Sequence, residues 1–461
     1  MMKSLRLSLL LGATVALGAC SLAPGYHRPD SAPAAATFKA DPGWVPAAPA
    51  DDAAKGAWWA LFADPALDAL EARVAVTNQN VAAARAALAQ ARAVLRADVA
   101  ALLPTAGVSG QTTSSSTLVT GSPTTRSWSA GASASWVPDL WGKIANTARA
   151  AKAQTQASQA SLANATLAAQ ASLATAYFQL RGVDAQAALL DTTVAGYQRS
   201  LEVARNKLAA GLTSPADVES ASATLANARA TRRDLARQRA ALENAIAVLV
   251  GENPSTFTLA AAPWQPAAPE VPAVLPASLV QRRPDVAAAE RAVAAANAQI
   301  GVQRAAFFPD LALTGTLGST AGTSAALFGA ANSLWSLGAS SALTVLDFGA
   351  RRARVAQARA GYDLAVATYR QSVLTAFQEV ENTLAAQSAY RAEAADYQRS
   401  AAAAIRAEEI VRNQYAAGSA DYTAVAAAQA QAYNARTVAI QNMVNRQTAA
   451  VGLIEAIGGR W

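Results

Sequence analysis

The chain has 461 residues, of which 52% are hydrophobic and 15% charged, so it can bury a large core and is far from a disordered composition. The formal net charge is +7, but Lys and Arg alternate with Asp, Glu and Gln, so we expect solvated helix faces and no nucleic-acid partner. A single cysteine and a single histidine give little support for a disulfide framework, a metal site or a His-based catalytic triad.

The N-terminus predicts export. Residues 1–19 contain two basic residues and then a short apolar run, as a secretory signal peptide does. The segment ends in Leu-Gly-Ala-Cys, which resembles a bacterial lipobox, and the only cysteine of the chain, Cys20, stands at its lipidation position. We therefore expect a lipid on Cys20, no other cofactor, and an extended Pro/Ala-rich segment over 20–60.

The first structural unit is expected over 61–250: a helix, a strand pair at about 105–136, a long helix over 142–210 and a return helix over 215–250. The stretch SWSAGASASW alternates small or polar residues with apolar ones, which is the period of a β-strand, and its apolar side begins at Trp128 and ends at Trp136. Segments of about ten residues with this pattern match transmembrane β-strands.

The second half repeats this order after a Pro-rich linker over 251–283. It runs over 284–461, with a strand pair at about 310–346, a long helix over 349–417 and a return helix over 422–457. Val-Ala-Ala-Ala at Val81 and at Val286 align, as do Pro104 and Pro309. We interpret the chain as a tandem duplication.

Four strands cannot close a membrane barrel, because the smallest spanning barrels have about eight strands and open sheet edges are not tolerated in lipid. Several chains must pool their strands, and a dimer with eight or a trimer with twelve is compatible with the sequence. The long helices, free of proline, would measure about 100 Å each. They predict a second, helical barrel that extends the pore away from the membrane and reverses at Gly211 and Gly418.

Several segments together resemble an outer membrane factor of the TolC-like superfamily, of the NodT/OprM type that serves resistance-nodulation-division efflux pumps. They are the lipobox with PGYHRP, the stretch QRRPDVAAAERAVAAANAQIGVQRAAFFPDLALTG, and PDLWGK, AGLTSPADV and IGGRW. The resemblance implies a homotrimer with a twelve-stranded barrel in the outer membrane and a twelve-helix periplasmic tunnel. It further implies a periplasmic adaptor protein at the tunnel tips, an inner-membrane pump that supplies the energy, and no enzymatic activity.

The resemblance also suggests a gate of acidic residues just past the tip turns. Relatives often carry an acid in the second tip where this chain has Ala427, so the candidate acids are Asp217 and Asp421. Both have a simpler interpretation as helix-capping carboxylates. Arg412 and Tyr415 are candidates for polar contacts that hold the helices closed.

The remaining candidate residues follow from position. Gly211, Leu212, Gly418 and Ser419 are expected to contact the adaptor. The tryptophans Trp128, Trp136 and Trp335 are expected at the lipid headgroup level, where indole is favoured, or packed inward against loops. The single histidine, His27, is expected to be structural. The acidic pairs at 51–52 and 408–409 are adjacent in sequence and do not indicate acid–base chemistry.

Alternative functions remain open from the sequence. A duct for a type I protein-secretion system is the nearest alternative. A lipid-anchored periplasmic coiled-coil scaffold without a pore is a different class, and it requires the Ser/Thr/Gly segments to be loops between helices. An enzyme is disfavoured by the residue inventory.

Overall fold

The computed structural model describes residues 22–30, 57–116, 118, 123–262, 264, 266–269 and 283–459. The predicted signal peptide and Cys20 lie outside these residues. The chain divides into two compact units, which we describe separately. The sheet unit comprises Met1–Asp30, Ala87–Gln159 and Ala288–Arg370, and the helical unit comprises Ser31–Ala86, Ala160–Ala287 and Gln371–Trp461.

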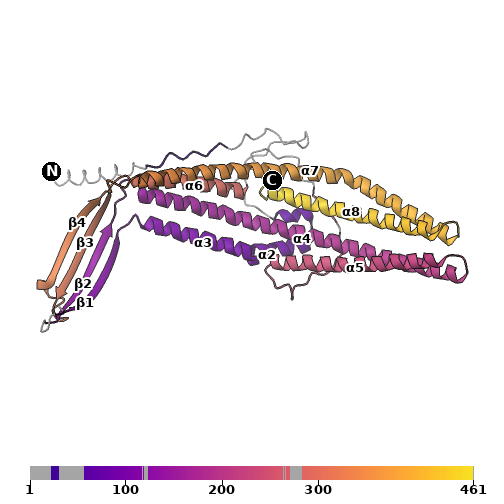
Figure 1. Ribbon diagram of the computed structural model, residues 1–461, viewed down its shortest axis with the longest axis horizontal. Helices are drawn as coiled ribbons and strands as arrows, with labels where there is room; N and C mark the ends of the chain where they lie inside the picture. The colour runs from indigo at the N-terminus through magenta and orange to yellow at the C-terminus, as the bar shows by residue number, and fades with distance from the viewer. Residues whose placement is uncertain are drawn as a thin grey trace. The chain divides into compact units, whose positions relative to one another are not determined.

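Helices make up most of the described chain (Figure 1). The helices are η1 (Trp58–Phe62), α2 (Pro65–Thr77), α3 (Gln79–Ala100), α4 (Lys143–Ala209), α5 (Pro215–Leu249), α6 (Pro284–Ala305), η3 (Ala330–Asn332), α7 (Ala350–Ala416) and α8 (Tyr422–Ala456). The strands are β1 (Thr105–Ser115), β2 (Thr125–Trp136), β3 (Asp310–Ala321) and β4 (Ser333–Ala342). The predicted fold class, long helices together with four strands, is confirmed at this level. Among the described helices, none is both long and apolar enough to cross a bilayer.

The helix predicted before the first strand pair is interrupted at Asn78. The backbone of Asn78 is extended. The nitrogen of its side-chain amide donates to the Leu249 carbonyl, and the oxygen of that amide accepts from the backbone N–H groups of Asn80 and Val81. The same side chain thus caps the start of α3 and ties it to the end of α5. One expected helix is therefore two, α2 and α3.

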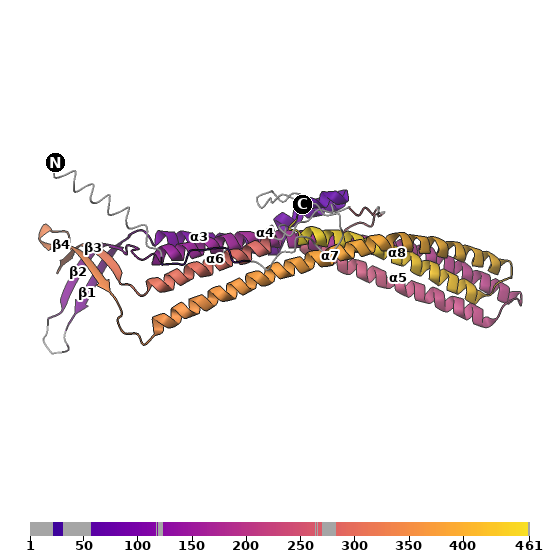
Figure 2. The same cartoon turned by 90° about the horizontal axis from the view of Figure 1, so that it is seen from above.

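The four strands form one antiparallel sheet in the order β1-β2-β3-β4 (Figures 1 and 2). The central pairing, β2 with β3, joins the two halves of the sequence: Ala132 lies opposite Leu317. β1 and β4 each have one edge without a partner strand among the described residues. Because the Ser/Thr/Gly segments are paired strands and not loops, the scaffold interpretation is wrong.

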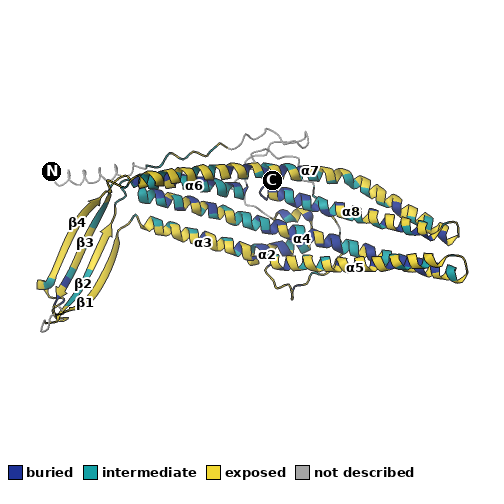
Figure 3. Ribbon diagram, viewed as in Figure 1, coloured by how far each residue is buried: buried dark blue, intermediate teal, exposed yellow. Residues whose placement is uncertain are grey.

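The register sorts the side chains of the sheet onto two contrasting faces, because directly opposed residues share a face. The mainly apolar face carries Ala106, Val108, Trp128, Ala130, Ala132, Ala134, Trp136, Leu311, Leu313, Leu317, Trp335, Leu337 and Ala339, together with Thr112, Ser319, Ser333 and Ser341. The hydroxyl face carries Thr105, Ser109, Thr113, Ser127, Ser129, Ser133, Ser135, Thr314, Thr316, Thr320, Ser336 and Ser340. Most of both faces is exposed in the single chain (Figure 3). The apolar face therefore needs an apolar environment that the described part of the chain does not supply.

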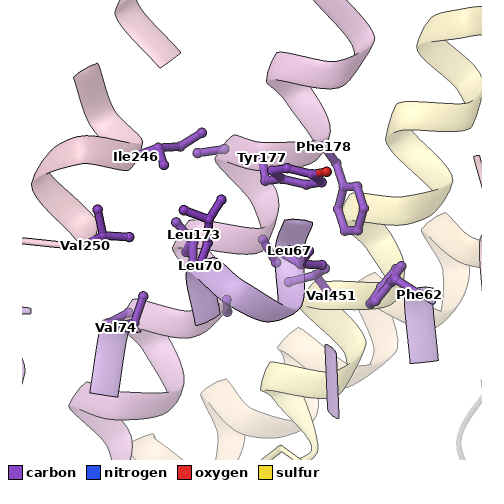
Figure 4. Close-up of a cluster of buried hydrophobic side chains, with 14 of the residues drawn as sticks. Phe62, Leu67, Leu70, Val74, Leu173, Tyr177, Phe178, Ile246, Val250 and Val451 are labelled. Atoms are coloured by element: carbon purple, nitrogen blue, oxygen red, sulfur yellow. The ribbon is translucent and has the colours of Figure 1, made fainter. Parts of the chain in front are cut away.

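The helical unit has a continuous apolar core where α2 packs against α4, α5 and α8 (Figure 4). Leu67, Leu173 and Ile246, from α2, α4 and α5, are fully buried in it. Each such side chain stabilises the fold by about 1.5–3 kcal/mol relative to its exposed state. Apolar residues thus hold together helices that are otherwise rich in alanine.

Candidate functional site

The two long helices, α4 and α7, end in two separate turns of the same type. At the end of α4, Gly211 has φ +73°, and Leu212 N–H donates to the Lys207 carbonyl. At the end of α7, Gly418 has φ +81°, and Ser419 N–H donates to the Gln414 carbonyl. This bond pattern is a Schellman C-cap, in which glycine accepts the left-handed conformation without strain. We call these two turns, residues 210–217 and 417–424, the tips.

The candidate adaptor-contact residues Gly211, Leu212, Gly418 and Ser419 are all exposed at the tips. Leu212 is the large apolar one, with 73% of its surface exposed.

Asp217 caps the start of α5. Its carboxylate accepts hydrogen bonds from the Thr213 hydroxyl and the Ser214 backbone N–H, and the Ser214 hydroxyl accepts from Asp217 N–H, which completes a capping box. The hydrogen bond from Thr213, more than any other cause, lowers the pKa of Asp217. The carboxylate is therefore charged at neutral pH.

Asp421 has the equivalent role at α8. Its carboxylate accepts hydrogen bonds from the Thr423 hydroxyl at 2.7 Å and from Ala424 N–H at 2.8 Å. Both bonds lower the pKa of Asp421, and the bond from Thr423 contributes most. Asp421 is close enough for its charge to oppose the ionisation of Asp217. The two candidate gate acids are thus neighbours in one tip cluster, while Ala427, in the second turn of α8, is exposed and carries no charge.

Lys207 and Tyr422 complete this cluster, and sequence reasoning missed both. Lys207 Nζ lies 3.9 Å from the centre of the Tyr415 ring and donates to the Tyr415 carbonyl at 2.5 Å. The Tyr415 and Tyr422 rings meet edge to face, 6.1 Å apart. A cation in the last turn of a helix is a recognisable signal, since it opposes the negative end of the helix dipole.

Tyr415 contacts its neighbours through its ring and its backbone. Its hydroxyl is buried and has no hydrogen-bond partner among the described residues. Burial, followed by the nearby charge of Asp217, raises its pKa. Arg412 is exposed and forms no ion pair with a described residue. The tip cluster therefore contains Lys207, Tyr415 and Tyr422 beside the two acids, and it does not include Arg412.

In the sheet unit, residues 22–30 form an extended segment, here called the strap, that lies on α6 and α7. On α6, Arg304 donates to the Leu22 carbonyl at 3.2 Å and Asn297 donates to the Pro24 carbonyl at 2.9 Å. The Tyr26 hydroxyl donates to the carboxylate of Glu290, and burial together with this bond raises the Tyr26 pKa. The strap is thus held along the whole length of α6 that lies in the sheet unit.

On α7, Arg28 donates to the Tyr369 hydroxyl at 3.1 Å and lies over its ring, and Arg370 donates to the Asp30 carbonyl. His27 is exposed. Gly301 allows the closest approach: a Cβ there would stand 2.6 Å from the Cβ of Ala23. The strap follows directly after the predicted lipidation site.

The three candidate interface tryptophans share the apolar face. Trp128 and Trp136 are eight residues apart on β2, about 26 Å along the strand. At the tilt of strands in an outer-membrane barrel, roughly 35–45°, this corresponds to a height of about 20 Å within an apolar band of about 25 Å. Trp335 lies in the row of Val108, Ala132 and Leu317, between the rows of the other two. Trp136 Nε1 donates to the Leu102 carbonyl.

The PDLWGK and RRPD motifs both hold helix ends. Trp141 stacks on Phe308, with ring centres 4.7 Å apart, and donates to the Pro309 carbonyl, so it joins the start of α4 to the start of β3. Arg283 is buried and donates to Asp285, to Glu379 and to the last carbonyl of α8, at Ala456. Among the described residues, no group of three or more His, Cys, Asp or Glu is placed to hold a metal ion.

Comparisons with known proteins agree with this arrangement. The sequence model of the family described as "Outer membrane efflux protein" matches residues 67–252 and 275–459. The chain is similar to the probable efflux pump outer membrane protein TtgC of Pseudomonas putida, with 31% identity over 470 residues that cover 100% of this chain and 96% of TtgC. It is also similar to the pyoverdine export outer membrane protein OpmQ of Pseudomonas aeruginosa, with 31% identity, covering 98% of this chain and 96% of OpmQ.

The solved structure of the outer-membrane channel OprN is similar along its whole length. The TM-score is 0.87 at 28% sequence identity, with 96% of this chain and 100% of the OprN chain covered.

Proposed function

This chain belongs to the outer membrane efflux protein family, and from that premise we propose that it is the passive exit channel of a tripartite efflux pump. It lies in the outer membrane and extends into the periplasm. The observation that carries this function is the sheet with one apolar and one hydroxyl face. Lipid on one side and water on the other stabilise such a sheet, whose apolar face is mostly exposed among the described residues.

The two unpaired edges support assembly from several chains, because an open edge in lipid leaves backbone groups without partners. We propose a homotrimer in which β4 of one chain pairs with β1 of the next and closes a twelve-stranded barrel. The long helices α3, α4, α6 and α7 then form the wall of a twelve-helix tunnel. The corresponding helices of the two halves have equal lengths, 22, 67 and 35 residues, which supports the predicted internal duplication.

Lipidation of Cys20 is part of the proposal and is supported by the strap. Leu22 is held by Arg304, in the last turn of α6, and β3 begins six residues later at Asp310. The strap therefore starts at the end of α6 that leads into the sheet, and this position supports a lipid anchor on the cysteine that precedes the strap in the sequence.

We propose that a periplasmic adaptor binds the tips and that an inner-membrane pump of the resistance-nodulation-division class loads the tunnel. Leu212 and its neighbours are the exposed residues that support an adaptor contact. We propose no catalytic step for this chain, since its family is one of channels.

The test compares a cation placed on either face of the sheet. Leu317→Lys puts it on the apolar face, and Thr316→Lys, one residue earlier, puts it on the hydroxyl face. A lysine facing lipid costs about 2–4 kcal/mol, so we expect Leu317→Lys to prevent insertion into liposomes and Thr316→Lys to insert and conduct in a planar bilayer. Equal insertion of both variants, or wild-type protein that is folded but never conducts, would contradict the channel.

A further inference from the structure

The sheet unit carries more basic than acidic side chains, whereas in the helical unit the two kinds are nearly balanced. Many of these cations are exposed, among them Arg352, Arg354 and Arg359 near the start of α7. Arg354 forms no ion pair with a described residue. The sheet unit therefore has positive charge that its own acids do not neutralise.

A groove of about 630 Å³ lies between α6 and α7 in this unit (Figures 1 and 2 show the two helices). Gln299 and Gln303 of α6 and Arg354 and Gln357 of α7 line it, and none of its described lining residues is acidic. None of these four side chains has a hydrogen-bond partner among the described residues. The groove thus offers free N–H donors from three amides and one guanidinium.

The floor of the groove is made of small residues, Ala296, Ala358 and Gly361. A Cβ added at Gly361 would meet no atom within 4 Å. The site therefore has room for a flat organic group beside the polar donors.

The groove opens on the side of α6 away from the strap. Gln299 and Gln303 each follow by two residues a position that the strap contacts, Asn297 and Gly301. Two residues correspond to about 200° around a helix. If the strap begins at a lipid in the surrounding membrane, it lies on the outer surface of the tunnel wall, and the groove faces the tunnel interior.

We propose that this groove is a transient binding site for small organic carboxylates in transit, and that the section of tunnel formed by the sheet unit favours anions. This inference rests on the proposed channel function. Arg354 would bind the carboxylate through two parallel N–H donors, the glutamine amides would complete its hydrogen bonds, and the small floor would accept the organic part.

The first test measures binding without a pore. Saturation-transfer NMR on the full-length protein in nanodiscs would use benzoate, with benzylamine as a cationic probe of the same size and empty nanodiscs as the blank. We expect transfer to benzoate and not to benzylamine. Arg354→Gln should weaken benzoate binding about tenfold, since a charged hydrogen-bonding partner is lost. Gly361→Phe should abolish binding by filling the groove.

The matched control is Arg359→Gln. It removes the same charge from the same helix, but it lies about 140° from Arg354 around α7, on the side away from the groove. We expect it to bind benzoate as the wild type does. Equal loss in Arg359→Gln would mean that net charge alone attracts the probe, and would overturn the site.

The second test measures the reversal potential of single channels in a KCl gradient. We expect chloride to be favoured over potassium in the wild type and in Arg359→Gln, and less so in Arg354→Gln. Two results would overturn this inference while conductance stays normal, and both leave the channel function intact. In the first, no variant changes benzoate binding. In the second, benzoate does not bind at all because a neighbouring chain fills the groove. If the channel does not conduct but benzoate binding follows the expected pattern, the proposed channel function is overturned and the binding site is kept.

Discussion

The ammonium of Lys207 donates a hydrogen bond to the backbone carbonyl of Tyr415, 208 positions later in the chain, and lies over the ring of the same residue. Lys207 is in the last turn of α4 and Tyr415 in the last turn of α7. One cation thus stabilises the negative ends of two helices and joins the two tips.

Replacing Lys207 by methionine should loosen the tips while it keeps the length of the side chain. A hydrogen bond from a charged donor contributes about 1.5–3 kcal/mol, so we expect a lower melting temperature and more frequent or larger open events in a planar bilayer. Arg205→Met, an exposed cation two residues earlier, is the control and should change neither. Identical recordings for both variants would remove Lys207 from any role in closure.

Asp217 and Asp421 both cap helices, so a gate role has to be separated from capping. Asparagine keeps most of the capping ability and removes the charge. If the two carboxylates form a constriction, the double variant Asp217→Asn, Asp421→Asn should shift selectivity away from cations with little change in melting temperature. The corresponding double alanine variant should also unfold more easily, by about 1 kcal/mol for each cap. If the double asparagine variant keeps the wild-type ion selectivity, the two residues cap their helices and do not form a charged constriction.

Glu71 of α2 should make the helical unit less stable as the pH rises. It is fully buried, neither carboxylate oxygen has a partner among the described residues, and burial raises its pKa from 4.5 to about 9. A raised pKa in the folded state means that stability is fully present below pH 4.5 and is lost progressively up to about pH 9, by at most about 1.4 kcal/mol per pH unit.

The measurement is thermal unfolding of wild type and Glu71→Gln at pH 5 and pH 8. We expect the wild type to lose stability at pH 8 relative to the variant, because glutamine cannot ionise. Glu202→Gln, at an exposed position, should follow the wild type. Parallel pH curves for wild type and Glu71→Gln would show that Glu71 finds a partner when ionised.

Gly301→Ala should displace the strap, since its methyl group would collide with Ala23 and with the Asn146 side chain. Gly196→Ala, in α4, meets nothing within 4 Å and should stabilise the helix by up to about 1 kcal/mol. Hydrogen exchange of the peptide covering residues 22–30 measures the difference: faster exchange is expected in Gly301→Ala only. Equal protection in both variants would show that the strap tolerates the extra methyl.

The long helices could be predicted from the sequence, because each covers a stretch of 69 residues without proline that is rich in Ala, Gln, Leu and Arg, which all favour the helical conformation. The sequence also predicted the four strands, from alternation and from the glycine-rich loops between them. The break at Asn78 was missed, because the amide that ends α2 gains its partner from Leu249, which no local pattern identifies.

The pairing of β2 with β3 and the composition of the tip cluster depend on contacts between distant segments. Periodicity identified the apolar side of β2, but only the register shows that Trp335 lies in the row of Ala132 and not in that of Trp128 or Trp136. Asp217 and Asp421 were found by their place after a turn. Lys207 was missed, because its carbonyl acceptor belongs to a helix far along the chain.

The hydroxyl face of the sheet is made mostly of serine, threonine and glycine, and Asp310, at the first position of β3, is its one acidic residue among the described strands. Thr316 and Ser336, whose hydroxyl oxygens are 2.7 Å apart, are a typical pair on this face. Alcohol groups neither gain nor lose a proton between strongly acidic and strongly alkaline conditions. The strand-lined end of the exit route therefore keeps nearly the same charge when the pH outside the cell changes.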